Sequence, residues 1–111
     1  ERGGVVGVAC DDWMLSPLWD PQAQDNTGIT LETVVDHVDH ICQVAGSPRH
    51  AAIGTDLDGG YGKEQSPADL ETIADLQQLS AILARRGYGD GDVAAILHGN
   101  WLRLLREGLP A

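Results

Sequence analysis

Two carboxylates, Asp56 and Asp58, directly follow a short apolar segment at residues 50–55 and precede two glycines. In a parallel α/β fold, ligands bind and catalytic groups gather where strands end, so this pair can do acid–base chemistry. If the strand continues through the motif, its alternation directs both side chains to the same side of the sheet. Asp and Gly also form ordinary turns. Spacing alone therefore leaves an acid–base site and a solvated turn as equal alternatives.

The same motif invites a second interpretation, because an apolar strand followed by Asp-x-Asp-Gly is similar to the nucleophile loop of haloacid-dehalogenase-like phosphatases. Residues 89–92, Gly-Asp-Gly-Asp, are similar to the late magnesium-binding motif of that family. However, that family has Thr or Val where Gly60 stands, and it needs a much longer intervening chain that holds a separate lysine. We therefore set this interpretation aside.

Four potential metal ligands lie within five residues of an expected helix: Asp36, His37, Asp39 and His40. On a helical wheel the two aspartates and His40 lie away from the apolar face, and His37 flanks it. A zinc site also needs ligands that converge from other elements. The pattern therefore predicts a structural cluster, in which Asp36 and His40 form an i,i+4 pair and His37 ties the helix to a neighbouring segment.

Three further polar or aromatic residues stand out. Trp13 and Trp19 belong to a loop at residues 11–28, where they either line a pocket above the strands or hold the loop against the body of the protein. Asn100 lies on the apolar face of the last expected helix. Because a buried amide must be hydrogen-bonded, we predict that Asn100 binds a backbone segment.

The elements that must position these residues alternate between strand and helix. We expect a fully buried strand at 3–10, a helix from Thr30 to Gly46, and a strand at 50–55. A further helix is expected to begin at Ser66 and to break near Asp75. The last helix is expected from about 90–92 to 107, which completes the order strand, helix, strand, helix, helix.

This order predicts an α/β fold with a parallel sheet covered by helices. The chain has 111 residues, which is one domain at most. Two parallel strands do not make a stable sheet, because each leaves an unpaired edge and an uncovered face. The sequence therefore predicts part of a larger α/β structure, whose missing strands come from upstream sequence or from other chains.

Composition excludes several classes of partner. Seventeen acidic residues against seven basic ones give a formal net charge of −10, which disfavours nucleic acid and anionic membrane surfaces. No stretch approaches the roughly 20 apolar residues that cross a bilayer, and we expect no leader peptide. Cys10 and Cys42 lie far apart without a disulfide-dense pattern, so we expect reduced thiols, which favours a cytoplasmic location.

Five segments together carry a resemblance to a known family. In order they are Gly-Gly-Val-Val-Gly-Val at 3–8, Asp-His-Val-Asp-His-Ile at 36–41, Ala-Ile-Gly-Thr-Asp-Leu-Asp-Gly-Gly at 52–60, Arg-Arg-Gly-Tyr at 85–88 and Gly-Asn-Trp-Leu-Arg-Leu-Leu at 99–105. Their order and spacing resemble the C-terminal part of the membrane (renal) dipeptidase family of metallopeptidases, over nearly the whole chain. The resemblance implies a (β/α)8 barrel of the amidohydrolase, TIM type. Residues 1–111 then form the C-terminal segment of that single barrel domain, with its last two strands and their helices.

The resemblance also implies a chemistry. The family holds two zinc ions with a bridging glutamate and several histidines, and all of these ligands lie upstream of the matched region, so no metal ligand is expected in this chain. The catalytic acid of the family maps to Asp56, which is expected to contact the metal-bridging water and the substrate and to shuttle a proton to the leaving amine. Asp58 belongs to the same motif and is expected to support Asp56 from the loop. Trp13 and Trp19 are expected to shape the pocket for the substrate side chain.

From this resemblance we expect the C-terminal portion of a zinc-dependent dipeptidase that hydrolyses the amide bond of dipeptides, that forms a homo-oligomer, and that is inactive as this segment alone. The alternative is a non-catalytic fragment or interaction module, which assembles with other chains through its exposed strand edges. Metal content and assembly size discriminate between the two.

Overall fold

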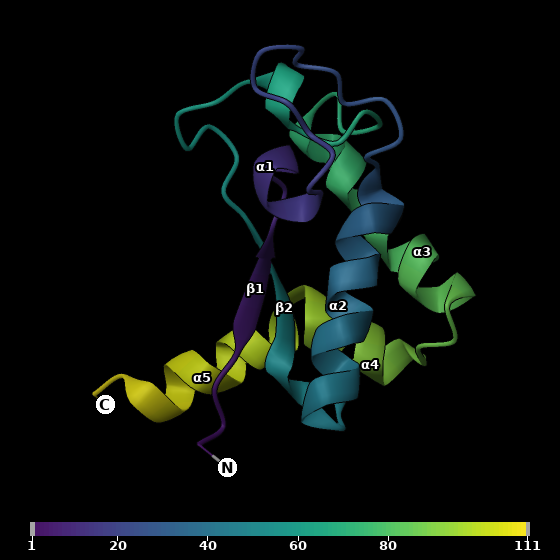
Figure 1. Cartoon of the computed structure of the whole chain (residues 1–111). Coiled ribbons are helices and arrows are strands. Elements are labelled where there is room, and N and C mark those ends of the chain that lie inside the picture. The colour runs from purple at the N-terminus through teal and green to yellow at the C-terminus, as the bar shows by residue number, and fades with distance from the viewer. Residues whose placement is uncertain (1, 111) are drawn as a thin grey trace.

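The computed structural model describes residues 2–110, and two parallel strands lie at its centre (Figure 1). Strand β1 spans Val6–Ala9 and strand β2 spans Ala51–Thr55. Val8 lies opposite Ile53, and a register shift then places Ala9 opposite Thr55. The strands approach closely at Gly7, where an added Cβ would lie 2.8 Å from the Trp101 ring and 3.2 Å from the Cα of Gly54. Only glycine fits there.

The first strand differs from its prediction, because it is four residues long and is not fully buried. Within β1 only Val8 is buried, whereas Val6 is 56% exposed. The physical reason is that the described part of the chain forms a two-stranded sheet, so β1 has a neighbour on one edge alone. An apolar run typical of an interior strand is therefore left partly open to solvent.

Helix α2, Leu31–Ala45, confirms the prediction closely. Thr30 is its N-cap residue, and the Thr30 backbone N–H donates to Thr33 Oγ1 at 3.1 Å. Gly46 ends the helix with φ 75°, a left-handed conformation that glycine adopts without strain. The buried face of α2 packs against both strands and consists of Leu31, Val34, Val35 and Val38.

The segment after β1 is not an irregular loop throughout, because it contains the short helix α1, Asp12–Leu15. The Asp11 carboxylate caps α1 by accepting the Trp13 N–H at 3.0 Å. Helix α1 contacts α2, and His37 Nε2 lies 2.9 Å from the carbonyl oxygen of Leu15. The prediction that His37 ties its helix to a neighbouring segment is therefore confirmed.

The predicted helix from Ser66 is wrong. Two short 3₁₀ turns flank β2 in the sequence: η1, Pro48–His50, precedes it, and η2, Lys63–Gln65, follows it. Beyond η2 the chain forms turns as far as the 3₁₀ helix η3, Ile73–Gln77. This 3₁₀ helix leads into helix α3, Gln78–Arg85. In this segment the Asp69 carboxylate accepts the Leu31 N–H, at the start of α2, at 2.8 Å. Asp75 accepts the N–H of Thr72 at 3.0 Å, so the helical segment begins after Thr72.

The last helical segment is continuous, with a π-helical turn in its middle. Helix α4, Asp90–Ala94, leads into the π turn η4, Ala95–Gly99, and then into helix α5, Asn100–Gly108. The Asn100 side chain is 2% exposed, and its Nδ2 donates to the carbonyls of Pro48 and Ala51, both at 2.8 Å. The prediction that Asn100 binds backbone is confirmed, and this contact fixes the last segment to the start of β2.

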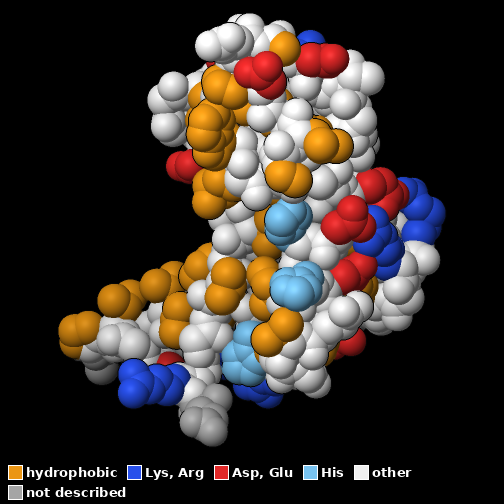
Figure 2. Space-filling model, viewed as in Figure 1, with side chains coloured by type: hydrophobic (Ala, Val, Ile, Leu, Met, Phe, Trp, Pro, Cys, Tyr) orange, Lys and Arg blue, Asp and Glu red, His pale blue; other side chains and the backbone are white. Residues whose placement is uncertain are grey.

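The fold is therefore a mixed α/β arrangement with helices packed against a parallel pair of strands, as the alternation of elements predicted. Helix α5 extends away from the body of the protein (Figure 1). Its outer side carries exposed leucines, and hydrophobic side chains line this arm in the space-filling view (Figure 2).

Candidate functional site

Asp56 lies immediately beyond the carboxyl end of β2, where the backbone turns sharply. Thr55, Asp56 and Asp58 all have positive φ angles, at 37°, 61° and 60°. Because residues with a Cβ adopt this region only at a cost of about 1–2 kcal/mol each, the turn stores strain. The strand does not continue through the motif, so alternation along β2 does not set the directions of the Asp56 and Asp58 side chains.

Local contacts fix the tip of this turn. The Asp56 N–H donates to the carbonyl of Gly54 at 2.5 Å, and the Gly59 N–H donates to the carbonyl of Asp56 at 3.1 Å. A Cβ on Gly59 would lie 2.5 Å from Asp56 Oδ1, so the carboxylate needs glycine at this position. Asp56 and Asp58 are both exposed, which leaves their carboxylates accessible to a ligand.

Two side-chain contacts connect the Asp56 loop to the rest of the strand ends. Tyr61 Oη donates to the carbonyl of Thr55 at 3.4 Å, and the Cys10 N–H donates to the same carbonyl at 2.7 Å. Gln65 Nε2 donates to Asp11 Oδ1 at 2.7 Å. The carboxyl end of β2 and the loop that follows it are therefore both hydrogen-bonded to the segment after β1.

This end of the sheet is strongly acidic. Asp12 is fully buried, neither of its carboxylate oxygens has a hydrogen-bond partner in the described structure, and burial together with Asp11 raises its pKa to about 7. Burial and Asp12 also raise the pKa of the Cys10 thiol to about 11. Burial, Asp11 and Asp56 raise the pKa of the Tyr61 hydroxyl above its ordinary value, so it stays protonated at neutral pH.

Sequence reasoning did not single out Asp11, Asp12 or Tyr61. The signal for the two aspartates is present, because they follow the apolar run of β1 as Asp56 follows that of β2. Tyr61 has no comparable signal, since its partner is a backbone carbonyl that only the turn at residues 55–59 brings within reach.

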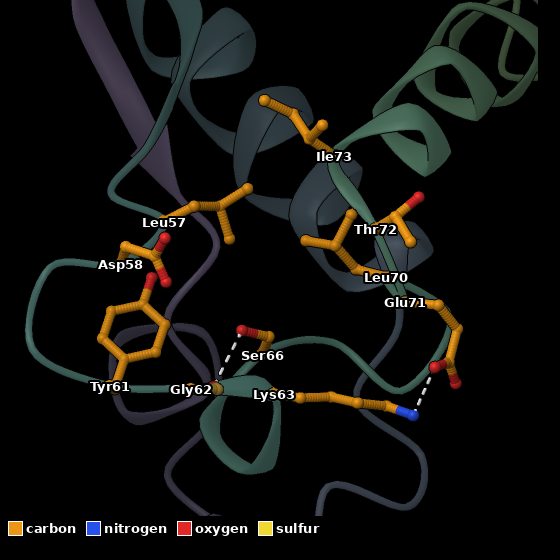
Figure 3. Close-up of a pocket in the computed structure, with 10 residues that line it drawn as sticks. All are labelled: Leu57, Asp58, Tyr61, Gly62, Lys63, Ser66, Leu70, Glu71, Thr72 and Ile73. Carbon is orange, nitrogen blue, oxygen red and sulfur yellow. Dashed lines mark hydrogen bonds and ion pairs between the residues drawn. The ribbon is translucent and has the colours of Figure 1, made fainter.

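A cavity of about 380 Å³ lies beside this loop (Figure 3). Leu57, Asp58 and Tyr61 line one side, and residues 70–73 line the other. Lys63 and Glu71 form an ion pair at the rim. The cavity combines apolar walls with charges of both signs, which suits a small zwitterionic or polar ligand.

The two tryptophans occupy different environments. Trp19 is 7% exposed and Trp13 is 59% exposed, and their rings meet edge to face with centroids 5.6 Å apart. Neither ring lines the cavity beside Tyr61. Trp19 therefore holds the loop against the core, whereas Trp13 covers it from outside and is free to meet a ligand.

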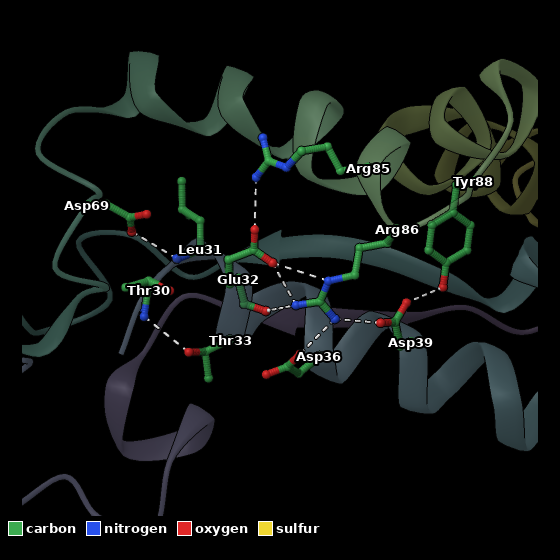
Figure 4. A network of polar contacts seen from close by, with 10 residues as sticks. All are labelled: Thr30, Leu31, Glu32, Thr33, Asp36, Asp39, Asp69, Arg85, Arg86 and Tyr88. Carbon is green, nitrogen blue, oxygen red and sulfur yellow. Dashed lines mark hydrogen bonds and ion pairs between the residues drawn. The ribbon is translucent and has the colours of Figure 1, made fainter. Parts of the chain in front are cut away.

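The acidic side chains of α2 form an ion network with arginines at and directly after the end of α3 (Figure 4). Arg86 Nη1 lies 2.7 Å from Asp36 and 2.6 Å from Asp39, and Arg86 Nη2 lies 2.7 Å from Glu32. The predicted structural cluster is confirmed, although Asp36 pairs with Arg86 rather than with His40. Within residues 2–110 no group of three or more His, Cys, Asp or Glu side chains is arranged to hold a metal ion. Zinc does not fit the residues present here.

Cys10 and Cys42 are both free, as expected for reduced thiols. In the part of the chain that the structure describes, no helix has the length and apolar character needed to cross a bilayer.

Comparison with known proteins identifies the family. A model of the membrane dipeptidase family, peptidase family M19, matches residues 1–108. An uncharacterized dipeptidase of Schizosaccharomyces pombe is 39% identical over 94% of this chain, which covers 23% of that protein. Dipeptidase 3 of Rattus norvegicus is 38% identical over 96% of this chain, which covers 20% of that protein. Dipeptidase aclJ of Aspergillus oryzae is 32% identical over 96% of this chain, which covers 23% of that protein.

The chain thus spans between 20% and 36% of the length of the curated relatives it matches first. No solved structure gives a significant match. The family match over nearly the whole chain, and the dipeptidases among its relatives, agree with the five segments that resemble this family. The chain belongs to the membrane dipeptidase family, peptidase family M19.

Proposed function

We propose that this chain is the C-terminal portion of a zinc-dependent dipeptidase, in which Asp56 is the acid–base group that assists hydrolysis of a dipeptide amide bond. One observation supports this proposal above the others. The family match includes the Gly-Thr-Asp-Leu-Asp-Gly-Gly motif, and Asp56 follows the carboxyl end of a parallel strand with its carboxylate exposed. Catalytic groups gather at this end of strands in α/β barrels.

The chemistry asked of Asp56 is proton transfer. In amide hydrolysis a water oxygen adds to the carbonyl carbon, the C–N bond breaks, and the leaving nitrogen gains a proton. A carboxylate at the strand end can accept the proton of the attacking water and donate it to the leaving amine. The exposed position of Asp56 and the supporting Gly59 backbone suit a group that meets substrate directly.

The metal belongs to other parts of the proposed enzyme. The described residues hold no metal site, so the two zinc ions that the resemblance implies need ligands outside this chain. We therefore propose that this segment is inactive alone and that the (β/α)8 barrel is completed by sequence or chains beyond it. Asp58 is assigned the supporting role beside Asp56.

The first prediction concerns Asp56. In the complete, zinc-loaded enzyme, Asp56→Asn should lower kcat by roughly 10²-fold or more, because an amide cannot exchange the proton. Zinc content, measured by elemental analysis, should stay at the wild-type value. The control is Asp90→Asn, in the first turn of α4 and remote from the strand ends, which should keep full activity. Near-normal turnover of Asp56→Asn defeats the assignment.

The second prediction concerns Trp13, which we propose contacts the substrate side chain. Trp13→Ala should change the ranking of kcat/KM across a panel of dipeptides with small, apolar and charged side chains, because its ring is 59% exposed on the rim segment after β1. Trp19→Ala, at the buried partner ring, should lower thermal stability instead. An unchanged ranking for Trp13→Ala removes Trp13 from the site.

The second candidate function is a non-catalytic interaction module. Its supporting observation is the set of exposed apolar side chains on and directly after helix α5, namely Leu102 and Leu105 in the helix and Leu109 after it. A module of this kind assembles with other chains and carries no zinc in the assembly.

A further inference from the structure

We propose that Tyr61 is a positioning residue for Asp56: its hydroxyl holds the Thr55 carbonyl and thereby keeps the Thr55–Asp56 turn in the conformation that presents the Asp56 carboxylate. This inference rests on the proposed role of Asp56 in dipeptide hydrolysis. It adds to that role the residue of this chain that maintains the geometry of the acid–base group.

The turn needs such support because its backbone is strained. Thr55 is β-branched and has φ 37°, a conformation that is a clear outlier for such a residue, and Asp56 follows with φ 61°. Each costs about 1–2 kcal/mol unless surrounding contacts hold it in place. A turn of this kind relaxes when its contacts are removed, and the direction of the Asp56 side chain changes with it.

Two donors hold the turn at one atom. The Thr55 carbonyl oxygen accepts the Cys10 N–H of the neighbouring segment at 2.7 Å and the Tyr61 hydroxyl at 3.4 Å. A carbonyl oxygen has two lone pairs, so both bonds form together. The Cys10 bond fixes the carbonyl toward β1, and the Tyr61 bond comes from the loop that carries Asp56 itself. The bond from Tyr61 is long, so its removal should have a moderate effect.

The Tyr61 ring is itself held in place. It is partly buried against the cavity beside Leu57 and Asp58 (Figure 3). Four residues later, Gln65 Nε2 donates to Asp11 Oδ1 at 2.7 Å, which ties the loop to the segment after β1. Tyr61 therefore lies on a segment anchored at both ends, between the Thr55 carbonyl and Asp11.

The surroundings also keep the hydroxyl in its donating form. Burial and the carboxylates of Asp11 and Asp56 raise the pKa of Tyr61 well above its ordinary value. A phenolate has no proton to donate to a carbonyl. The acidic strand ends therefore keep the Tyr61 hydroxyl protonated, and able to donate, at neutral pH.

The test is a double-mutant cycle in the complete, zinc-loaded enzyme. Tyr61→Phe removes the hydroxyl and keeps the ring. We expect kcat to fall about tenfold with KM within about twofold of wild type, because a displaced acid–base group slows chemistry more than binding. Zinc content should not change. In the Asp56→Asn background, Tyr61→Phe should cause no further loss, because the group it positions is already gone.

A matched control is available in Tyr88, whose hydroxyl donates to Asp39 at 2.5 Å in the network between α2 and α3. Tyr88→Phe removes the same atom far from the strand ends and should leave kcat and KM at wild-type values. If Tyr61→Phe does not fold, Gln65→Met cuts the second anchor of the loop instead. It should lower kcat by a smaller factor that also disappears in the Asp56→Asn background.

The outcomes separate this inference from the proposed function. Full turnover of both Tyr61→Phe and Gln65→Met, with Asp56→Asn inactive, overturns the positioning role and leaves the proposed function standing. A raised KM, or an equal loss in the Asp56→Asn background, means that Tyr61 contacts substrate directly and also overturns it. Full turnover of Asp56→Asn itself overturns the proposed function and, with it, the basis of this inference.

Discussion

At the scale of single residues, the buried carboxyl group of Asp12 makes the stability of the fold depend on pH. It is fully buried after β1, neither oxygen has a hydrogen-bond donor in the described structure, and its pKa rises from 3.8 to about 7, mainly because of burial. The folded protein therefore binds a proton here that the unfolded chain releases near pH 4. The stability associated with the protonated group is fully present below about pH 4 and is lost as the pH rises toward 7.

This linkage predicts a pH-dependent effect of Asp12→Asn. Between pH 5 and pH 8 the wild type should lose up to about 3 kcal/mol of stability relative to the variant, because the variant has no proton to release. Urea denaturation of both proteins at the two pH values measures the difference. Asp20→Asn, at an exposed position in the same segment, controls for the loss of one negative charge. The prediction fails if the difference between wild type and Asp12→Asn is equal at both pH values.

At the scale of elements, Arg86, directly after α3, is the main polar link between the end of α3 and helix α2. The Arg86 guanidinium donates to the side chains of Glu32 and Asp39, forms an ion pair with Asp36, and also donates to the Glu32 carbonyl at 3.0 Å (Figure 4). The hydrogen bonds that Arg86 donates to Glu32, Asp36 and Asp39 raise its pKa, so it stays charged. Without it, Asp36 and Asp39 lose the cation that they pair with, whereas Glu32 keeps its ion pair with Arg85.

Replacing Arg86 should therefore destabilise the protein far more than replacing its neighbour Arg85. We expect Arg86→Gln to cost about 2–3 kcal/mol, because the partly buried Asp39 carboxylate and the Glu32 carbonyl lose a charged hydrogen-bond donor. Arg85 is 65% exposed in a single ion pair with Glu32, so Arg85→Gln should cost about 0–1 kcal/mol. Thermal denaturation of the two variants makes the comparison. Equal costs show that the network adds nothing beyond surface ion pairs.

At the scale of the whole molecule, the chain exposes surface that an isolated domain ordinarily covers. Val6 on β1, Ile73 in η3 and two leucines of α5 are exposed, and Figure 2 shows hydrophobic side chains along the α5 arm. The relatives extend well beyond the matched region, since this chain covers 23% of the fission yeast dipeptidase. Exposed apolar surface of this kind is typical of protein–protein interfaces. It supports our expectation that the chain functions within a larger assembly.

Native mass spectrometry of zinc-supplemented protein tests this expectation. The isolated chain of 11.8 kDa, or its homo-oligomers, should carry no stoichiometric zinc, because the described residues form no metal site. A longer polypeptide or a complementing assembly should carry two zinc ions per active unit. Two zinc ions on the isolated chain contradict the proposal that the ligands lie elsewhere. A complete assembly without metal favours the interaction module over the dipeptidase.

Features that depend on neighbouring residues could be predicted from the sequence. The helix between Thr30 and Gly46 could be predicted because its caps and its apolar face lie within the helix or next to it. The same holds for the order of strands and helices and for the position of Asp56 after a strand. The backbone contact of Asn100 could also be predicted in kind, because a polar residue on an apolar face must find a partner.

The distant partner of each polar group could not be predicted, because it depends on how the elements pack in three dimensions. Asp69 accepts the N–H of Leu31, 38 residues earlier, and the helix expected from Ser66 does not form. Gln65 meets Asp11 across 54 residues, and Tyr61 reaches Thr55 only because the backbone reverses at a strained turn. Local pattern encodes a residue's need for a partner, whereas the packing of the strands and helices selects that partner from donors and acceptors far along the chain.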